Sequence, residues 1–195
     1  MLYKEGKKNL SNSADLKLWK GLKSGDRKSL KELHFKYFNE LLIYGLKLSN
    51  NRLKSVEAIQ DIFVYLWDKH LILSEVNNVK AYIFKSFRNK ILKNSFSELQ
   101  YSDELKLSDQ EPADLSIEES IIQKDTHKEK RKIIGNILNC LPDKQREIIS
   151  LRFFHNLSYR EISDIVGIEY QSVRNSIHRS IKTIREAFNG EFNNK

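Results

Sequence analysis

The sequence predicts an all-α protein made of two small helical domains joined by an acidic linker. Three observations favour this class. The 195 residues include only seven glycines and two prolines, too few for a turn-rich all-β protein. Apolar residues recur at helical spacing, and no window keeps the alternation that is typical of a strand. A hydrophobic content of 39% supplies enough apolar surface to bury a core or a pair of cores.

The charge of the chain changes sign along its length. It totals +8, from 34 basic and 26 acidic residues, and a basic balance favours a polyanionic partner. Residues 1–95 carry 19 basic and 9 acidic side chains, residues 96–129 carry 3 and 10, and residues 130–195 carry 12 and 7. The three segments therefore have net charges of +10, −7 and +5. We expect a basic domain at 12–97, an acidic linker at 98–129 and a second basic domain at 130–188.

The expected linker is rich in Asp, Glu and Ser and has almost no aromatic residues. Such a composition is typical of a solvated loop. A second interpretation is that the linker mimics the charge of nucleic acid and occupies a basic channel in a partner.

Four helices are expected in the first domain. Gly25-Asp26 and Ser49-Asn50-Asn51 interrupt the helical pattern, because these residue types favour turns and helix ends. The expected helices span 14–23, 27–48, 53–70 and 78–96.

The third of these helices has an apolar side and an acidic side. At 100° per residue its core side holds Ile59, Ile62, Phe63 and Leu66, and its opposite side holds Glu57, Gln60, Asp61, Val64 and Asp68. An acidic face does not bind phosphate, so we expect it to dock on a basic protein surface, with Trp67 at its edge as an anchor. A face that only confers solubility is the alternative.

The fourth helix interleaves aromatic and basic residues. Its core side holds Ile83, Phe84, Phe87 and Ile91, which leaves Tyr82, Lys85, Ser86, Asn89, Lys90 and Lys93 for a ligand. Exposed rings stack on unpaired bases and lysines follow the backbone, so this face suits single-stranded nucleic acid. Tyr82 is the ring that we expect to be available.

The second domain is expected to contain helices at 117–140, 143–154, 159–166 and 170–188. Pro142 lies near the start of one and Gly190 follows the last. The single cysteine, Cys140, cannot form an internal disulfide. It lies in an apolar run, where we expect it to be buried as a small hydrophobic residue.

A helix-turn-helix is predicted within this domain. Ser158 and Glu161 have the spacing of a capping box, in which each side chain accepts from the other residue's backbone amide. Gly167 follows the first helix and can adopt the positive φ of a tight turn. The second helix begins near Tyr170.

The last helix has an apolar and a basic side. Its core side is expected to hold Val173, Ile177, Ile181, Ile184 and Phe188, and its opposite arc holds Gln171, Arg174, Asn175, His178, Lys182 and Arg185. This mixture of donors suits base edges and phosphates in a major groove. An ordinary solvated basic face is the alternative.

Several other classes of protein are not supported by the sequence. No apolar run is long enough for a membrane span, and no apolar signal core follows the N-terminal lysines. The five histidines, His34, His70, His127, His155 and His178, lack metal-ligand spacing. We therefore expect a cytoplasmic protein without a metal, a cofactor or a small-molecule ligand.

Three segments together resemble RNA polymerase sigma factors of the extracytoplasmic-function class in the sigma-70 family. They are IQDIFVYLWDK (59–69), VKAYIFKSFRNKIL (79–92) and LPDKQREIISLRFFHNLSYREISDIVGIEYQSVRNSIHRSIKTIRE (141–186). The resemblance covers about 16–188 and includes the acidic linker. It implies a region 2 bundle, a region 4 helix-turn-helix, and a function in promoter recognition and transcription initiation.

The resemblance also implies roles for individual residues. Those expected to bind the largest subunits of core polymerase are Glu57, Gln60, Asp61, Val64 and Trp67. Those expected at the minus-ten element, where a base is flipped, are Tyr82, Lys85, Asn89, Lys90 and Lys93. Those expected at the minus-thirty-five element are Gln171, Ser172, Arg174, Asn175, His178, Arg179 and Lys182.

The resemblance implies further partners as well. Region 4 is expected to pack on the polymerase flap, and a membrane-anchored anti-sigma factor is expected to hold the protein inactive. Many members have an Asp where this chain has Lys93, and Thr-Val-Lys-Ser-Arg where it has 172–176, Ser-Val-Arg-Asn-Ser. Base preference is therefore not transferred from the family.

Two other functions remain as alternatives. A stand-alone DNA-binding regulator would share the helix-turn-helix but would not need the acidic face around Asp61. A nuclease would need a metal site or an activated nucleophile, and no motif for either is recognisable.

Overall fold

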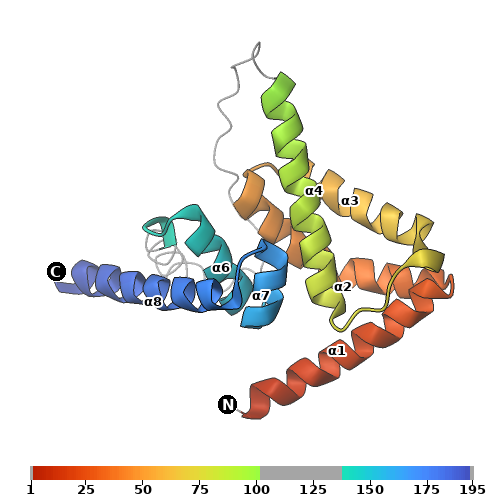
Figure 1. The fold of residues 1–195 in the computed structure, drawn as a ribbon, viewed down its shortest axis with the longest axis horizontal. Helices are drawn as coiled ribbons and strands as arrows, with labels where there is room; N and C mark the ends of the chain where they lie inside the picture. The colour runs from red at the N-terminus through yellow and green to blue at the C-terminus, as the bar shows by residue number, and fades with distance from the viewer. Residues whose placement is uncertain (1, 102–137, 194–195) are drawn as a thin grey trace, which may run out of the picture. The chain divides into compact units, whose positions relative to one another are not determined.

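The computed structural model describes residues 2–101 and 138–193, and the side chains of 12–93 and 138–189. The chain divides into two units, Met1–Ala113 and Asp114–Lys195, so the division falls inside the linker expected at 98–129. Every regular element in the described ranges is helical (Figure 1). Most of the linker, and nearly all of the helix expected at 117–140, lie outside the described residues.

The first unit contains the four expected helices and one short additional turn. Its elements are α1 (Leu2–Lys23), α2 (Arg27–Ser49), α3 (Arg52–Asp68), the 3-10 helix η1 (His70–Ile72) and α4 (Val79–Tyr101). α1 begins before residue 14 and α4 continues past 96, so both are longer than predicted. α3 ends at Asp68 because the backbone tightens into η1 at His70.

Short polar residues fix the helix ends in the first unit, as the sequence predicted. Asp26 accepts from the amides of Lys28 (3.0 Å) and Ser29 (3.1 Å) at the start of α2. Asn50 is left-handed (φ 49°) at the end of α2, and Asn51 caps α3. The preference of Asp and Asn for these positions explains why both breaks were visible in the sequence.

Aromatic side chains form the centre of the first unit. Trp19, Tyr37, Tyr44, Phe84 and Phe87 are almost completely buried, and the Tyr44 and Phe84 rings stack with centroids 5.4 Å apart. α4 packs against α1, α2 and α3. This packing holds the apolar side of α4 inward and leaves its basic side toward solvent.

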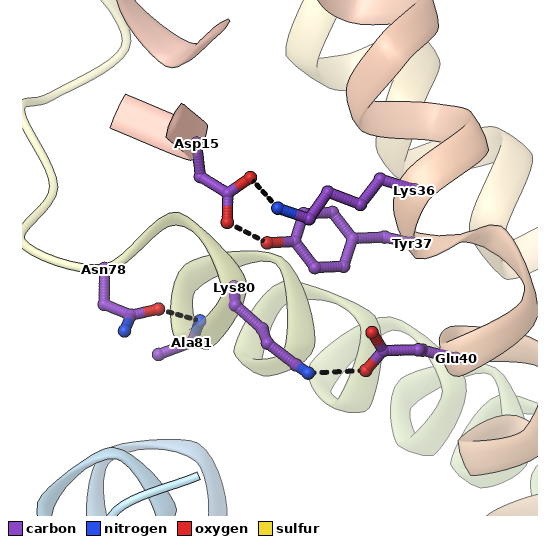
Figure 2. A network of polar contacts seen from close by, with 7 residues as sticks. All are labelled: Asp15, Lys36, Tyr37, Glu40, Asn78, Lys80 and Ala81. Carbon is purple, nitrogen blue, oxygen red and sulfur yellow. Dashed lines mark hydrogen bonds and ion pairs between the residues drawn. The ribbon is translucent and has the colours of Figure 1, made fainter. Parts of the chain in front are cut away.

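A buried carboxylate joins α1 to α2, and an ion pair joins α2 to α4 (Figure 2). Asp15 is 2% exposed; it accepts from the Tyr37 hydroxyl at 2.5 Å and pairs with Lys36. Burial and the Asp15 charge both raise the pKa of Tyr37, so its hydroxyl stays protonated and donates. Glu40 pairs with Lys80 at 2.5 Å. The Glu40–Lys80 pair therefore holds the first turn of α4 against α2.

The second unit contains the predicted helix-turn-helix. Its described helices are α6 (Asp143–Phe153), α7 (Tyr159–Val166) and α8 (Tyr170–Asn193). The capping box is present: Glu161 accepts from the Ser158 amide at 2.5 Å, and Ser158 accepts from the Glu161 amide at 3.3 Å. Gly167 has φ 74° in the turn. Both features were predicted from spacing alone, and both are confirmed.

Three expectations for the second unit are wrong. Ile181 is 38% and Phe188 47% exposed, because the buried row of α8 passes instead through Val173, Ile177 and Ser180. Ser180 is buried with its hydroxyl donating to Ser176 (2.8 Å) and Gln145 (3.2 Å), and a polar residue is invisible to a search for apolar periodicity. Gly190 does not end α8, which continues to Asn193. Cys140 is exposed, since the chain turns there before α6.

Candidate polymerase and nucleic-acid interfaces

The polar side of α8 is exposed over its whole described length. Val173 and Ile177 turn inward against α6 and α7. Residues three or four positions apart lie on the same face of a helix, so Gln171, Arg174, Asn175 and His178 share the exposed side. The exposed residues include all those predicted for the minus-thirty-five element, namely Gln171, Ser172, Arg174, Asn175, His178, Arg179 and Lys182. The Gln171 amide donates to Asn175 at 3.3 Å, which orders two donor-acceptor groups side by side.

The acidic side of α3 is exposed as its periodicity predicted. Ile59, Ile62, Phe63 and Leu66 are buried, and Glu57, Gln60, Asp61 and Val64 are exposed. Val64 is 58% exposed, so an apolar contact point lies within a polar surface. We call this surface, Glu57, Gln60, Asp61 and Val64, the α3 face.

An open apolar groove of about 540 Å³ runs between α2 and α3, beside the α3 face. Its lining residues are Arg27, Leu30, Lys31, His34, Phe35, Gln60, Phe63, Val64 and Trp67. One wall therefore carries two cations from α2, and the other belongs to the helix whose outer side is acidic. A ligand that fits this groove needs an apolar ridge with charges of both signs along its edges.

Trp67 is held in place at one end of the groove. The guanidinium of Arg27 lies 5.4 Å from the centre of the Trp67 ring, and the His70 ring stacks on it at 5.1 Å. His70 Nδ1 lies 2.6 Å from the Trp67 carbonyl oxygen. The indole is half-buried by these contacts, so it presents one fixed edge to a partner.

His34 lines the groove from α2. Its ring meets Phe63 edge to face with centroids 4.9 Å apart. Burial lowers the pKa of His34 below its ordinary value of 6.5, because an apolar environment disfavours the charged imidazolium. The groove therefore holds a neutral histidine at neutral pH.

α4 presents most of the cations predicted for the minus-ten element. Ile83, Phe84, Phe87 and Ile91 are buried as predicted. Lys85, Asn89 and Lys93 are exposed, whereas Ser86 and Lys90 are half-buried. We call the surface formed by Lys85, Asn89 and Lys93 the α4 basic face.

One ion pair joins residues that were predicted for two different sites. Lys90 Nζ lies 2.8 Å from Asp61 Oδ2, with both side chains more than a third exposed. Asp61 was predicted to contact polymerase, and Lys90 to contact DNA. The two predicted surfaces therefore adjoin along the line where α3 packs on α4.

Tyr82 is less available than predicted. Its ring packs edge to face on Trp19 at 5.0 Å, and the residue is half-buried. Burial raises the pKa of the Tyr82 hydroxyl. The Trp19 indole donates in turn to the Ser74 carbonyl at 3.2 Å. Tyr82 therefore supports the segment before α4, and its role in binding a base stays a prediction.

Comparisons with known proteins agree with this arrangement. Residues 131–184 match the family model "Sigma-70, region 4". The chain is 21% identical over 86% of its length to the ECF RNA polymerase sigma factor SigM of Bacillus subtilis, covering 99% of that protein. It is 20% identical over 79% of its length to the RNA polymerase sigma factor YlaC of the same organism, covering 88% of that protein.

This chain belongs to the extracytoplasmic-function class of the sigma-70 family. It is a sigma factor, which directs RNA polymerase to promoters and so initiates transcription. The resemblance identified from the three sequence segments is thereby confirmed.

Solved structures confirm the all-α fold of this sigma factor. CnrH, in a complex with the cytosolic domain of CnrY, matches 91% of the chain with a TM-score of 0.63 at 16% identity, and 98% of that chain is covered. RpoE from Bartonella quintana, in a complex with the anti-sigma factor NepR, matches 83% with a TM-score of 0.60 at 22% identity, again covering 98% of that chain.

None of the helices among the described residues is long and apolar enough to cross a membrane. No group of three or more His, Cys, Asp or Glu side chains within 12–93 and 138–189 is arranged to hold a metal ion.

Sequence reasoning missed the α2 side of the groove. Phe35 is 68% exposed and lies on the wall opposite Val64. A large aromatic residue two positions after the buried Leu33 was a usable signal, because it cannot share the core side of the same helix. The contribution of Arg27 and Lys31 depends on how α2 packs against α3, which no single-helix pattern contains.

Proposed function

We propose that the two units of this sigma factor divide its work. The first unit binds core RNA polymerase through the α3 face and the adjoining groove, and contacts the melted minus-ten element through the α4 basic face. The second unit reads the minus-thirty-five element with α8 and packs on the polymerase flap. The observation that carries this division is a difference in surface chemistry: the exposed side of α3 is acidic and apolar, whereas the exposed sides of α4 and α8 are cationic.

The α3 face suits protein rather than nucleic acid. Glu57 and Asp61 would repel phosphates, and the groove beside them exposes mainly apolar surface. Val64 and the edge of Trp67 supply the buried anchor that a protein partner needs. A partner helix with an apolar ridge and basic flanks would satisfy both features.

The polar side of α8 suits a major groove. Arg174, Asn175 and His178 lie on one exposed side of a long helix that follows a tight turn, which is the geometry of a recognition helix. Phosphate contacts would come from Arg179 and Lys182 at the edges of the same side.

Other parts of the proposal concern location, chemistry and control. We propose that the protein acts in the cytoplasm and has no catalytic site of its own, since the polymerase forms the bonds. Two of the solved structures that share its fold are complexes, one of CnrH with the cytosolic domain of CnrY and one of RpoE with the anti-sigma factor NepR. These complexes support an anti-sigma partner for this chain, which we propose to be anchored in the membrane.

Retention on core polymerase tests the α3 face. We expect Asp61→Lys to abolish pull-down by core RNA polymerase while the circular dichroism spectrum is unchanged. Because Asp61 pairs with Lys90, this variant also places two cations together. Gln60→Lys is the matched variant, since Gln60 lines the groove but is outside that pair. Unchanged retention of both variants would contradict the proposal and favour a stand-alone regulator.

Run-off transcription tests the division of function as a whole. Core polymerase with genomic fragments should initiate at new sites only when this chain is added. We expect Asp61→Lys to remove all of these transcripts, and substitutions on α8 to change which fragments are used. Cleavage of the fragments by the chain with a divalent metal would instead revive an enzymatic function.

A further inference from the structure

The line along which α3 packs on α4 has a defined register. The Asp61–Lys90 pair joins the helices at one point. Tyr65 lies one turn further along α3, and Ser86 and Tyr82 lie one and two turns back along α4. Burial raises the pKa of the Tyr82 hydroxyl, and the neighbouring Tyr65 raises it further, which agrees with this register. By this register Tyr65 lies nearest Ser86, one helical turn from Tyr82.

The two tyrosines differ in what they offer to a ligand. Tyr82 is half-buried against Trp19, whereas Tyr65 is 54% exposed. The only other exposed aromatic ring among the described side chains of the first unit is that of Phe35, which lines the groove on the α2 side. Tyr65 is thus the available ring near α4.

Tyr65 and Trp67 mark opposite edges of the α3 face. At 100° per residue, Tyr65 projects about 80° from Glu57 in one direction and Trp67 about 80° in the other. The Trp67 edge borders the apolar groove. The Tyr65 edge borders α4, whose Lys85, Asn89 and Lys93 are exposed. The two aromatic residues therefore face surfaces of different chemistry.

An exposed ring beside a row of cations is a surface for unpaired bases. Lysine side chains follow the phosphates of a single strand, and a ring within reach stacks on the base between them. A duplex keeps its base faces covered, so the ring gains a partner only after the strands separate. The Tyr65 hydroxyl can remain in water while the ring is covered.

We propose that Tyr65 is a stacking platform for an unpaired base of the melted promoter strand that follows the α4 basic face. This inference rests on the proposed contact between α4 and the minus-ten element. It assigns to α3, the helix proposed for polymerase, a second contact with DNA at its other edge.

The test measures binding of single-stranded DNA by the full chain. A fluorescein-labelled oligothymidylate is titrated and followed by anisotropy, because base stacking tolerates any sequence. We expect Tyr65→Ala to weaken binding about five-fold or more, and Tyr65→Phe, which keeps the ring, to bind within about two-fold of the unaltered chain. Phe35→Ala is the matched control, since it removes an exposed ring from the other side of the unit, and it should leave binding unchanged.

A second measurement distinguishes stacking from a structural effect. Oligothymidylate carrying 5-iodouracil, irradiated in the complex, should cross-link to Tyr65 and be located there by peptide mass spectrometry. Substitution of an exposed residue should leave the unfolding transition, followed by tryptophan fluorescence, where it was. Cross-linking confined to other residues would overturn the inference.

The failure of this inference is distinguishable from failure of the proposed function. If Lys85→Ala weakens oligothymidylate binding and Tyr65→Ala does not, the α4 basic face stands and the stacking role of Tyr65 is refuted. If neither substitution has an effect, or the unaltered chain does not bind, both are refuted. If Tyr65→Ala reduces retention on core polymerase but not DNA binding, Tyr65 is a protein anchor and the inference is wrong.

Discussion

α4 and α8 are both long basic helices proposed to contact promoter DNA, yet their surroundings differ. α4 is packed against three other helices, and two of its lysines are tied to neighbouring carboxylates, Lys80 to Glu40 and Lys90 to Asp61. On α8 only one row of residues, Val173, Ile177 and Ser180, is buried, and beyond it Ile181 and Phe188 are exposed. A helical surface proposed to bind DNA can therefore have its side chains positioned by neighbouring helices, as on α4. It can also extend beyond the packed part of its helix, as on α8.

The largest expected difference between the helices concerns their apolar residues. Phe87 is completely buried on α4, so Phe87→Ala should cost about 3–5 kcal/mol of unfolding free energy. Phe188 is 47% exposed on α8, so Phe188→Ala should change it by less than about 0.5 kcal/mol. Both tryptophans lie in the first unit, so urea unfolding followed by tryptophan fluorescence measures the stability of the Phe87→Ala variant. Urea unfolding followed by circular dichroism measures that of the Phe188→Ala variant.

The next difference concerns how each helix contacts DNA. If Arg174 on α8 reads a base, Arg174→Ala should cost about 1–3 kcal/mol at the preferred promoter and little elsewhere. Lys85→Ala on α4 should instead weaken all promoters alike and reduce the salt dependence of binding. Holoenzyme binding to a set of promoter variants at several salt concentrations measures both. A uniform loss for Arg174→Ala would make that residue a phosphate contact.

A smaller difference concerns the ion pairs of the two helices. Lys90→Met breaks the 2.8 Å contact with Asp61 and should cost about 0.2–1 kcal/mol, an effect that added salt removes. Lys182 lies 3.8 Å from Glu186 with both side chains largely exposed. Lys182→Met should therefore leave the free energy of unfolding nearly unchanged. An equal cost for both, measured by urea unfolding, would mean that the Asp61 contact does not support α4.

The smallest expected effect is a pH dependence of the first unit. Burial lowers the pKa of His34 below 6.5, so the unfolded state binds more protons than the folded state as pH falls through 6.5. The stability of the first unit should decrease across this window. His34→Gln should reduce the decrease, as followed by tryptophan fluorescence in urea. An unaltered pH profile in this variant would assign the effect to other groups.

Local patterns in the sequence predicted the helices and their faces well. Asp26, Asn51, Ser158 and Gly167 act within a few residues of their own position, so their effects follow from spacing. The sides of α3 and α4 were also correct, because many apolar residues mark them. On α8 the apolar pattern was misleading, since the buried row includes Ser180 in place of Ile181.

The parts of the site that depend on contacts between helices were not predictable. The groove needs the α2 residues Arg27 and Phe35 opposite α3. The half-burial of Tyr82 depends on where the Trp19 ring lies. Each involves residues far apart in the sequence, whose relative positions are set by packing and not by the period of one helix.

The ion pair between Asp61 and Lys90 has a consequence for genetics. An allele at Asp61 chosen to weaken polymerase binding also releases a lysine beside the surface proposed for DNA. Second-site suppressors of such an allele should therefore arise on α4 of the same chain as well as in the polymerase. Epistasis between Asp61 and Lys90 would reveal that selection acts on them as one unit, although the sequence separates them into two motifs.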